Sequence, residues 1–516
     1  MTRLALLSTS DKSGLVDLAQ TLVAEFGFQL LSSGGTAATL AAANIPVTKV
    51  SDYTQSPEIL GGRVKTLHPK IHGGILARRD LEADLADLAA QAMEPIDLVV
   101  VNLYPFQATI AKADVSFGDA IENIDIGGPT LIRAAAKNHA HVTVLSNPSQ
   151  YAAYLQQLRS AGARPTPEFR LQCAQAAFAH TAEYDQAIAN YLLTAADSNP
   201  DQPLPATFTL SGVIQQTLRY GENPHQAAAW YRTGTTPTGW AAADLLQGKE
   251  LSYNNLLDLE AARSLVAEFS DQPTAVIVKH TNPCGVATAS TLKSAYERAF
   301  AADSVSAFGG IVALNRPLDA ETSELLTQTF LECVVVPGCE PAAVAQLAHK
   351  PKVRVLVAPD LTVGPPLPIR TIAGGFLAQA ASEQAPSPDQ WEIVTQSQPT
   401  PEQWQDLIFA WKVVKHVKSN AIVVAKELQT LGIGAGQMNR VGSVQIALAD
   451  AAAAAQGAVL ASDGFFPFAD SVQTAAAAGV KAIVQPGGSL RDQESIQAAN
   501  ELGLVMVFTN RRYFRH

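Results

Sequence analysis

Lys279 and His280 stand side by side where an apolar run ends, in Ala-Val-Ile-Val-Lys-His-Thr-Asn-Pro-Cys-Gly at residues 275–285. Together an amine and an imidazole can donate and accept a proton near neutral pH. A buried strand of an α/β sheet delivers side chains to its carboxyl edge, where ligands usually bind. We therefore predict a strand that ends at an acid–base pair, with Pro283 and Gly285 breaking the chain beyond it. The local sequence equally allows a surface strand end with two solvated polar residues.

Two loops combine small hydroxyl side chains, glycine and lysine immediately after predicted strands. The first is Ser8-Thr9-Ser10-Asp11-Lys12-Ser13-Gly14, and the second is Ser32-Ser33-Gly34-Gly35-Thr36. Hydroxyls, a lysine and the exposed N–H groups of a helix start suit a phosphate. Neither loop indicates a function alone, but two such loops at adjacent strand ends would clamp one phosphomonoester. The pattern is not GxxxxGK[ST], so a nucleoside triphosphate is not indicated.

Three further stretches place polar side chains among glycines or at a strand end. Residues 61–74 read Gly-Gly-Arg-Val-Lys-Thr-Leu-His-Pro-Lys-Ile-His-Gly-Gly, and Tyr104 follows a predicted strand. Asp125 stands in an apolar, glycine-rich turn, where a lone aspartate is more often a helix cap. Arg133 and Lys137 are four residues apart, so they lie on one face of a helix.

Length, composition and charge restrict the class of protein. A chain of 516 residues is long for one domain, so we expect two or three, and 47% apolar residues can fill large cores. The net charge of −11 argues against broad nucleic-acid binding, which needs a basic face. Four cysteines without a CxxC pair predict a reduced cytoplasmic chain with no metal site. The N-terminus lacks the features of a signal peptide, and no run of about 18 apolar residues indicates a membrane span.

The first ~195 residues alternate short apolar runs with amphipathic segments, which predicts a parallel, doubly wound α/β sheet. The predicted strands are Leu4–Leu7, Gln29–Leu31, Val47–Val50, Leu98–Val101 and Val142–Leu145. The predicted helices are Leu15–Phe26, Thr36–Ala43, Asp80–Ala92 and residues 167–194. Three prolines within residues 197–205 predict a linker, so the expected domains are 1–196 and 206–516.

The second domain is also predicted to be α/β. Its predicted strands are Val276–Val278, Ile311–Leu314, Val334–Val336, Val353–Val357, Ile422–Ala425, Val459–Ala461, Ala482–Val484 and Val505–Phe508. A Pro-rich stretch near 359–368 and a polar stretch at 383–401 could separate two lobes. The sequence gives no indication of an internal repeat.

Long motifs connect the chain with a known family. The first half contains SGGT, RVKTLHP, NLYPF and IDIGGPTLIRAAAKNH. The second half contains LRYGENPHQ, LSYNNLLD, VKHTNPCG, SAFGGIVAL, IGAGQMNR, SDGFFPF, QPGGS and FTNRRYFRH. These stretches resemble the bifunctional purine-biosynthesis enzyme AICAR transformylase/IMP cyclohydrolase, and the resemblance covers nearly the whole chain.

For the first domain the resemblance implies a methylglyoxal-synthase-like fold that closes formyl-AICAR to inosine monophosphate with loss of water. A carboxamide nitrogen attacks a formamide carbon, so the site needs a base, an acid and donors for the oxyanion. The family's catalytic positions match Lys65, Tyr104, Asp125 and Lys137. We expect Lys65 to be the oxyanion donor and the other three to transfer protons. The family's binding positions match Ser10, Lys12, Ser33, Gly34, Gly35, Thr36, Arg63, Thr66 and Gly127.

For the second domain the resemblance implies two cytidine-deaminase-like lobes without a zinc site. It also implies formyl transfer from 10-formyltetrahydrofolate to the 5-amino group of AICAR. In this interpretation His280 is the base, Lys279 the general acid, and Asn420 the donor that polarises the formyl oxygen. Positions that hold the nucleotide or shape the folate cleft match Arg219, Tyr220, Asn255, Gly309, Glu332, Phe465, Asp470 and Arg512.

Some positions depart from the family pattern. Glu332 is an acid where some relatives carry Asp, Asn439 replaces an expected serine, and Ala469 replaces an expected arginine. The C-terminal residues 511–516 are basic and aromatic, so composition alone allows a loose anion-binding tail. The family pattern instead predicts an ordered segment that reaches the nucleotide site.

Two other classes of function are weaker interpretations. A regulatory first domain would need the phosphate loops but not the catalytic set of Lys65, Tyr104, Asp125 and Lys137, all of which are present. An acidic nucleic-acid scaffold conflicts with the net charge of −11. The resemblance implies small-molecule partners and a homodimer, with no membrane. It does not predict channelling between sites, monovalent ion binding, polyglutamate preference or regulation.

Overall fold

The structure is a computed structural model that describes residues 3–516 except 113, 161–163, 197–203, 205–206, 235, 366 and 382–386. The chain separates into two compact units, Met1–Thr209 and Leu210–His516. The predicted linker 197–205 lies outside the described residues, apart from Leu204.

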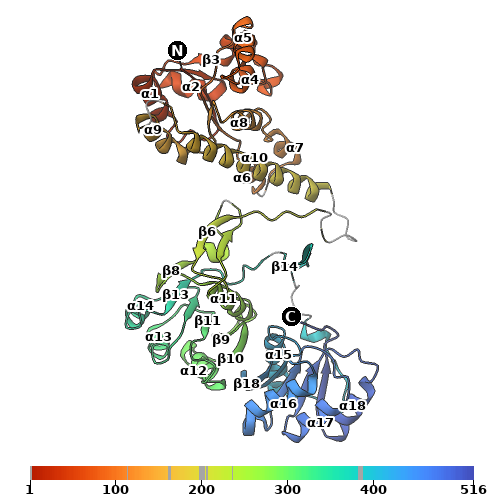
Figure 1. Cartoon of the computed structure of the whole chain (residues 1–516). Helices are drawn as coiled ribbons and strands as arrows, with labels where there is room; N and C mark the ends of the chain where they lie inside the picture. Colours follow the sequence, from red (N-terminus) through yellow and green to blue (C-terminus); the bar gives the residue numbers. More distant parts are fainter. Residues whose placement is uncertain are drawn as a thin grey trace. The chain divides into compact units, whose positions relative to one another are not determined.

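The first unit is a parallel α/β sheet, as predicted (Figure 1). Its strands are β1 (Arg3–Thr9), β2 (Phe28–Ser32), β3 (Thr48–Lys49), β4 (Leu98–Asn102) and β5 (Thr143–Leu145). Its α-helices are α1 (Leu15–Phe26), α2 (Gly34–Ala42), α3 (Val50–Thr54), α4 (Pro69–Leu76), α5 (Glu82–Ala90), α6 (Phe106–Ile110), α7 (Phe117–Glu122), α8 (Gly127–Lys137), α9 (Tyr151–Ser160) and α10 (Pro167–Ala196). The strand order β3-β2-β1-β4-β5 is that of a doubly wound sheet.

Buried leucine and valine side chains of β1 and β4 form the centre of this unit's core. Because parallel strands are covered on both faces, they read as continuous apolar runs, which is why their positions were predicted correctly. The order of the strands also sets where a ligand can bind. The chain builds β2 and β3 on one side of β1 and β4 and β5 on the other, so the strand order changes direction between β1 and β4. Ligands of such sheets bind at the carboxyl ends of the strands at this point.

The second unit is built on one mixed sheet of twelve strands with order β16-β21-β20-β19-β17-β18-β10-β9-β11-β12-β13-β8. These strands are β8 (Asp244–Gln247), β9 (Thr274–Lys279), β10 (Asn282–Thr288), β11 (Ile311–Leu314), β12 (Cys333–Val336), β13 (Arg354–Val357), β16 (Glu392–Ile393), β17 (Ile422–Lys426), β18 (Gln429–Gly434), β19 (Val459–Ser462), β20 (Ala482–Gln485) and β21 (Val505–Phe508). Two separate hairpins pair β6 (Val213–Leu218) with β7 (Ala228–Arg232) and β14 (Ile369–Ile372) with β15 (Gly375–Ala378). The α-helices are α11 (Tyr253–Val266), α12 (Leu292–Ala302), α13 (Ala320–Leu326), α14 (Pro341–Leu347), α15 (Pro401–Val414), α16 (Arg440–Ala451), α17 (Asp470–Ala477) and α18 (Asp492–Glu501).

This sheet contains a structural repeat that the sequence alone did not indicate, in agreement with the two similar lobes that the family resemblance implies. The elements α11-β9-β10-α12-β11-α13-β12-α14-β13 and α15-β17-β18-α16-β19-α17-β20-α18-β21 follow the same order. Each half contains an antiparallel hairpin, an antiparallel neighbour and two parallel strands. The halves meet where β10 pairs with β18. Only a few residue types recur at equivalent positions, such as Gly285 with Gly432 and Asp258 with Asp406, so the repeat is hard to see in the sequence.

Alternate side chains of the central strands enter different cores. Val276 and Val278 of β9 join Val423 and Ala425 of β17 in one core under α11 and α15. On the other face, each half has a core of its own, under α12 and under α16. The shared core packs the two lobes against each other, so the ends of β9 and β17 have fixed positions relative to one another.

The strand β9 ends at Lys279, but the prediction that Pro283 and Gly285 interrupt regular structure after His280 is wrong. Pro283 and Gly285 lie inside β10, where the register shifts between them. A Cβ on Gly285 would lie only 1.9 Å from the carbonyl oxygen of Ala299, so glycine allows α12 to pack directly on the strand. Gly432 of β18 has the same relation to Ala447 of α16, at 2.0 Å. These glycines mark close helix packing rather than the end of a strand.

Candidate active sites

The first candidate site lies where β1, β2 and β4 end. The N–H of Thr9 donates to Thr36 Oγ1 at 3.0 Å, which joins the loops after β1 and β2. The N–H groups of Ser10 and Asp11 donate to Asn102 Oδ1 at 2.6 and 2.8 Å, which joins the loops after β1 and β4. The sequence interpretation missed Asn102 as a site residue. Its place at the end of a strand, just before Tyr104, was the available signal.

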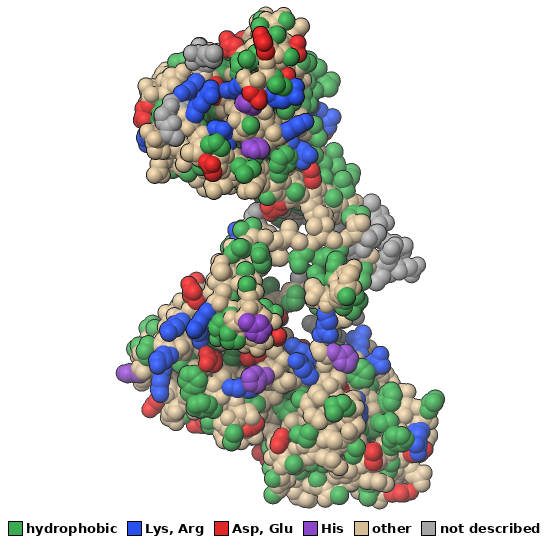
Figure 2. All heavy atoms as spheres, viewed as in Figure 1, with side chains coloured by type: hydrophobic (Ala, Val, Ile, Leu, Met, Phe, Trp, Pro, Cys, Tyr) green, Lys and Arg blue, Asp and Glu red, His purple; other side chains and the backbone are tan. Residues whose placement is uncertain are grey.

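Two ammonium groups approach the start of α2. A Cβ on Gly34 would lie 3.3 Å from Lys65 Nζ, and a Cβ on Gly35 would lie 3.9 Å from Lys12 Nζ. Ser33 occupies the N-cap position of this helix. Positive side chains, a hydroxyl and helix N–H groups therefore converge, as a phosphate site requires. On the face of this unit seen in Figure 2, lysine, arginine and histidine side chains gather despite the negative net charge of the chain.

Asp125 lies just before α8 and is enclosed by backbone donors. The N–H of Gly128 donates to its Oδ1 at 2.8 Å, and its own N–H donates to the hydroxyl of Tyr184 at 2.8 Å. Burial raises the pKa of Asp125, while N–H groups of Gly128, Tyr104 and Gly127 and the charge of Lys65 act in the opposite direction. A partly desolvated carboxyl with a raised pKa accepts a proton more readily than an exposed aspartate does.

Three other predicted residues have different surroundings. A Cβ on Gly127 would lie 3.2 Å from Thr66 Oγ1, so both residues belong to the Asp125 site. Arg63 instead pairs with Glu122 of α7 at 2.5 Å, and both side chains are mostly exposed. Its guanidinium is therefore engaged outside the phosphate loops.

The structure does not bring Lys137 to Asp125. Lys137 ends α8, while Asp125 precedes its first residue. A helix of 11 residues spans about 16 Å at roughly 1.5 Å per residue. Arg133 and Lys137 share a helix face, as predicted, and both line a cavity of about 440 Å³ with His139 and Phe178.

The second candidate site lies where β9 ends in the second unit. Lys279 Nζ donates to the carbonyl oxygens of Phe308 and Gly309 at 2.9 and 3.1 Å. Gly309 has a φ of 68°, and a Cβ there would lie 3.0 Å from Lys279 Nζ. Glycine at this position therefore leaves room for the lysine, a role that the loop sequence SAFGG does not show by itself.

Asn282 links the Lys279-His280 turn with the loop that carries Asn420. Its Nδ2 donates to the carbonyl oxygen of His280 at 3.3 Å, and its Oδ1 accepts from the N–H of Lys418 at 3.0 Å. Residues far apart in sequence thus meet at one edge of the sheet. The structure brings Lys279, His280 and Asn420 into one region, and Asn282 was missed by the sequence interpretation.

The side-chain amide of Asn420 is held at both ends. Its Nδ2 donates to the carbonyl oxygen of Gln437 at 2.8 Å, and its Oδ1 accepts from Arg440 at 2.8 Å. Arg440 is buried and pairs with the fully buried Asp463 at 2.6 Å. This ion pair fixes the direction of the amide and leaves one Nδ2 hydrogen for another acceptor.

The other predicted binding residues have varied surroundings. Arg219 lies over the ring of Tyr220, and Arg512 over the ring of Phe514. Asn255 is buried in a capping box with Ser252 at the start of α11. Glu332 pairs with Arg354 at 2.9 Å, and its N–H donates to Gly310, next to Gly309. Phe465 follows β19, and Asp470 is the first residue of α17.

The two unexpected residues lie at helix starts. Asn439 caps α16 by accepting a hydrogen bond from the N–H of Gly442 at 2.7 Å, which a serine could also do. Ala469 occupies the N-cap position of α17 and has no side chain to cap it.

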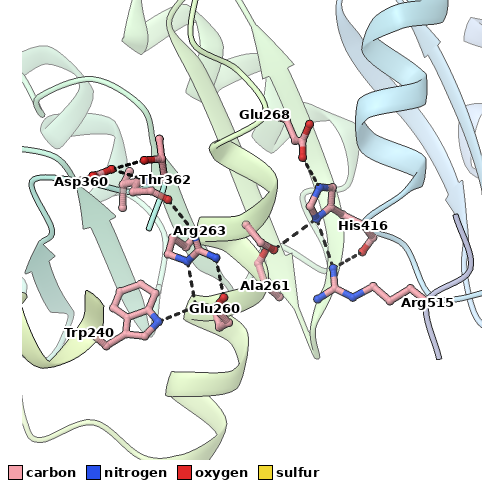
Figure 3. A network of polar contacts seen from close by, with 11 residues as sticks. Trp240, Glu260, Ala261, Arg263, Glu268, Asp360, Thr362, His416 and Arg515 are labelled. Atoms are coloured by element: carbon pink, nitrogen blue, oxygen red, sulfur yellow. Dashed lines mark hydrogen bonds and ion pairs between the residues drawn. The ribbon is translucent and has the colours of Figure 1, made fainter. Parts of the chain in front are cut away.

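The C-terminal segment makes specific contacts within the second unit and is not a loose tail, while its approach to a nucleotide stays a prediction. Ser419 and Arg515 exchange hydrogen bonds, and the N–H of Tyr513 donates to the carbonyl oxygen of Asp463 at 3.0 Å. Figure 3 shows Arg515 beside His416, which in turn faces Glu268 at the end of the α11 region. Burial lowers the pKa of His416. These contacts place the segment next to Asn420.

All four cysteines are free. Burial raises the pKa of Cys284 and of Cys333 to about 12, so these thiols stay protonated at neutral pH. No cluster of three or more His, Cys, Asp or Glu side chains that could hold a metal ion occurs in the described part of the chain. None of the described helices is long and apolar enough to cross a membrane.

Two α/β units, one with phosphate-type loops beside a buried carboxyl and one with a Lys-His pair, define an enzyme with two separate candidate active sites. Residues 14–130 match the MGS-like domain, and residues 135–450 match the family described as AICARFT/IMPCHase bienzyme. The chain is 67% identical to the bifunctional purine biosynthesis protein PurH of Cyanothece sp. and 68% identical to that of Thermosynechococcus vestitus, over the full length of each chain. The protein in the solved structure described as "Crystal structure of ForH" is 37% identical; that structure has a TM-score of 0.34 and covers 36% of this chain and 95% of its own.

The chain belongs to the family of AICARFT/IMPCHase bienzymes. It is a bifunctional enzyme of purine biosynthesis, with AICAR formyltransferase and IMP cyclohydrolase activities on one chain. Formyl transfer of this kind implies a folate co-substrate.

Proposed function

We propose that the first unit carries the cyclohydrolase and the second unit the formyltransferase, with 10-formyltetrahydrofolate as the formyl donor. The support is the distribution of charged groups. The first unit has two loops suited to one phosphate, beside Asp125 and Lys65. The second unit has an amine, an imidazole and an oriented amide at one sheet edge.

In the proposed cyclohydrolase site, Lys12 and the N–H groups at the start of α2 hold the phosphate of formyl-AICAR. Asp125 takes a proton from the carboxamide nitrogen as that nitrogen attacks the formamide carbon. Lys65 donates a hydrogen bond to the oxyanion that develops, and a proton from Tyr104 converts this oxyanion to a hydroxyl group. The C–O bond then breaks as the 5-formamido nitrogen gives its proton to the Tyr104 phenolate and forms the C=N bond. The hydroxyl leaves as water with the proton that Asp125 held. Preorganised donors directed at a developing charge stabilise the transition state. The proximity of Lys65 to Gly34 supports this role, because it lies between the phosphate loop and Asp125.

In the proposed formyltransferase site, His280 accepts a proton from the 5-amino group of AICAR as that nitrogen attacks the formyl carbon. Asn420 Nδ2 donates to the formyl oxygen, and Lys279 protonates the folate nitrogen that leaves. The contacts of Lys279 with two carbonyl oxygens support a fixed ammonium at this position. The buried pair of Arg440 and Asp463 supports a fixed direction for the Asn420 amide.

The observation that carries this proposal is the Asn282 bridge, since it joins His280 to the Asn420 loop. The test separates the two reactions by mutation. His280→Ala should lower formyl transfer by ~10²–10⁴-fold, the usual effect of losing one acid–base group, while cyclisation of supplied formyl-AICAR stays near normal. Incubation of the wild type with AICAR and 10-formyltetrahydrofolate should yield inosine monophosphate. Loss of cyclisation in a folded His280→Ala protein would contradict the two-site assignment.

We propose further that the formyltransferase acts as a homodimer in the cytoplasm. Large apolar side chains beside Lys279 and Asn420 support an additional surface there. Phe308, whose carbonyl oxygen accepts from Lys279, is 61% exposed, and Met438, which follows the Asn420 partner Gln437, is 91% exposed. Apolar side chains exposed together are typical of an interaction surface. The absence of disulfides among the described cysteines agrees with a reducing compartment.

A further inference from the structure

The second unit makes the same strained turn twice. His280 and Thr281, between β9 and β10, have φ angles of 51° and 63°. Glu427 and Leu428, between β17 and β18, have φ angles of 54° and 57°. Residues other than glycine resist this left-handed conformation, and a β-branched residue such as Thr281 resists it most. A two-residue turn without glycine therefore needs stabilisation from outside the hairpin.

A carboxylate from the preceding helix supplies this stabilisation at both turns. The N–H of Thr281 donates to Asp258 Oδ1 at 2.7 Å. The N–H groups of Glu427 and Leu428 donate to Asp406 at 2.9 and 2.7 Å. Asp258 is the sixth residue of α11, and Asp406 is the sixth residue of α15. The two aspartates therefore occupy equivalent positions in the repeat.

The two carboxyl groups also share their electrostatic setting. Burial raises the pKa of each, and the turn N–H groups act in the opposite direction. At Asp258 the charges of His280 and Lys279 act in that direction as well. The turns differ in their side chains, because one has Lys279-His280 and the other has Lys426-Glu427. Lys426 Nζ donates to the carbonyl oxygen of Gln456.

We propose that Asp258 is a positioning residue for formyl transfer, because its carboxylate holds the turn that presents His280. This inference rests on the proposed role of His280 as the base. Asp258 acts through the backbone and does not touch the reacting atoms. Asp406 makes the equivalent contact at a turn without that role, so it is the internal control.

The test compares Asp258→Ala with Asp406→Ala in the full-length protein. Both variants lose a carboxylate that holds a strained turn, so both should lose thermal stability. Only Asp258→Ala should lower kcat for formyl transfer, by about tenfold to hundredfold, since misplacing a reacting group by ~1 Å can cost ~10²-fold. Its KM for AICAR should stay within about twofold, and its cyclisation of formyl-AICAR should be unchanged. If the Ala variants do not fold, the pair Asp258→Asn and Asp406→Asn makes the same comparison with a weaker acceptor.

The outcomes separate this inference from the proposal beneath it. Equal effects of the Asp258 and Asp406 variants on kcat overturn the positioning role. So does a full loss of formyl transfer in His280→Ala combined with a normal kcat in Asp258→Ala. Normal formyl transfer by His280→Ala instead refutes the assignment of His280 as the base, and this inference with it.

Discussion

At the scale of single residues, burial disfavours the charged form of Asp125, while several backbone hydrogen bonds stabilise it. Burial raises its pKa, so protonation of the carboxyl begins at a higher pH than for an exposed aspartate. If the carboxylate is the base, cyclisation is supported above this pKa and is lost as the pH falls through it. A pH–rate profile with formyl-AICAR should therefore show an acid limb, and Asp125→Asn should lower the rate by ~10²–10⁴-fold and lack that limb. A limb that persists unchanged in Asp125→Asn would assign the titration to another group.

Whether Lys137 acts together with Asp125 can be tested, because the length of α8 separates the two residues. Neighbouring groups that act together have non-additive mutational effects, whereas distant groups have additive ones. The backbone N–H of Tyr104 reaches the Asp125 carboxyl, so the two residues are neighbours. Because their side chains transfer protons in the same proposed reaction, Tyr104→Phe and Asp125→Asn should be non-additive in cyclisation rate. Lys137→Ala and Asp125→Asn should be additive within ~0.5 kcal/mol. Double-mutant cycles with formyl-AICAR measure both pairs, and strong coupling of Lys137 to Asp125 would show that they act as one unit.

Some functional residues were not predictable from the sequence for a physical reason. Asn102, Asp258 and Asn282 each act through contacts with residues distant along the chain, such as Asn282 with Lys418. The sequence can show where such a residue stands, as with Asn102 at a strand end, but it does not show which distant group the residue contacts. Lys279 and His280, in contrast, stand at the end of an apolar run, and the end of a strand is visible locally.

At the scale of elements, apolar strands were predictable and interrupted ones were not. The strands β11 and β21 have the predicted limits, because each is a short run of buried apolar residues. The prediction missed β10 and β18, since Pro283, Gly285 and Gly432 interrupt their apolar pattern. Those glycines permit contact with α12 and α16, which is a property of packing rather than of the strand.

The turn before β11 offers a test at this scale. Gly309 has a φ of 68° and carries the carbonyl oxygen that accepts from Lys279. Gly309→Ala should cost about 1–2 kcal/mol from the left-handed backbone and displace the ammonium as well. The matched control is Gly374→Ala, whose φ is 79° and whose added Cβ would meet nothing within 4 Å. Thermal unfolding should show a loss in both variants, while assays of formyl transfer should show a fall of at least about tenfold in Gly309→Ala alone. Equal activity of the two variants would remove Gly309 from the support of Lys279.

At the scale of the whole molecule, the second unit repeats one design and uses the two copies differently. Both halves share a core under α11 and α15. The hairpin of β9 and β10 presents Lys279 and His280, whereas the loop before β17 in the other half supplies Asn420. In the proposed formyltransferase site, residues of both lobes therefore contribute, and Asn282 joins their loops within this chain. The first unit has its own core and its own candidate site, so the two activities should depend on different parts of the molecule.

The last prediction concerns assembly. The exposed Phe308 carries a carbonyl oxygen that accepts from Lys279, and the exposed Met438 follows Gln437, which accepts from Asn420. A second subunit on this surface would cover both apolar side chains. The phosphate loops and Asp125 of the first unit lie within one domain. Dilution should therefore lower the specific activity of formyl transfer, with a midpoint at the dimer dissociation constant, while cyclisation keeps its specific activity. Sedimentation across the same concentrations gives that constant independently.

Mixing a Lys279→Ala protein with an Arg219→Ala protein should restore some formyl transfer if the two positions of one site come from opposite chains. A monomer that transfers formyl groups at full rate would refute the dimer requirement.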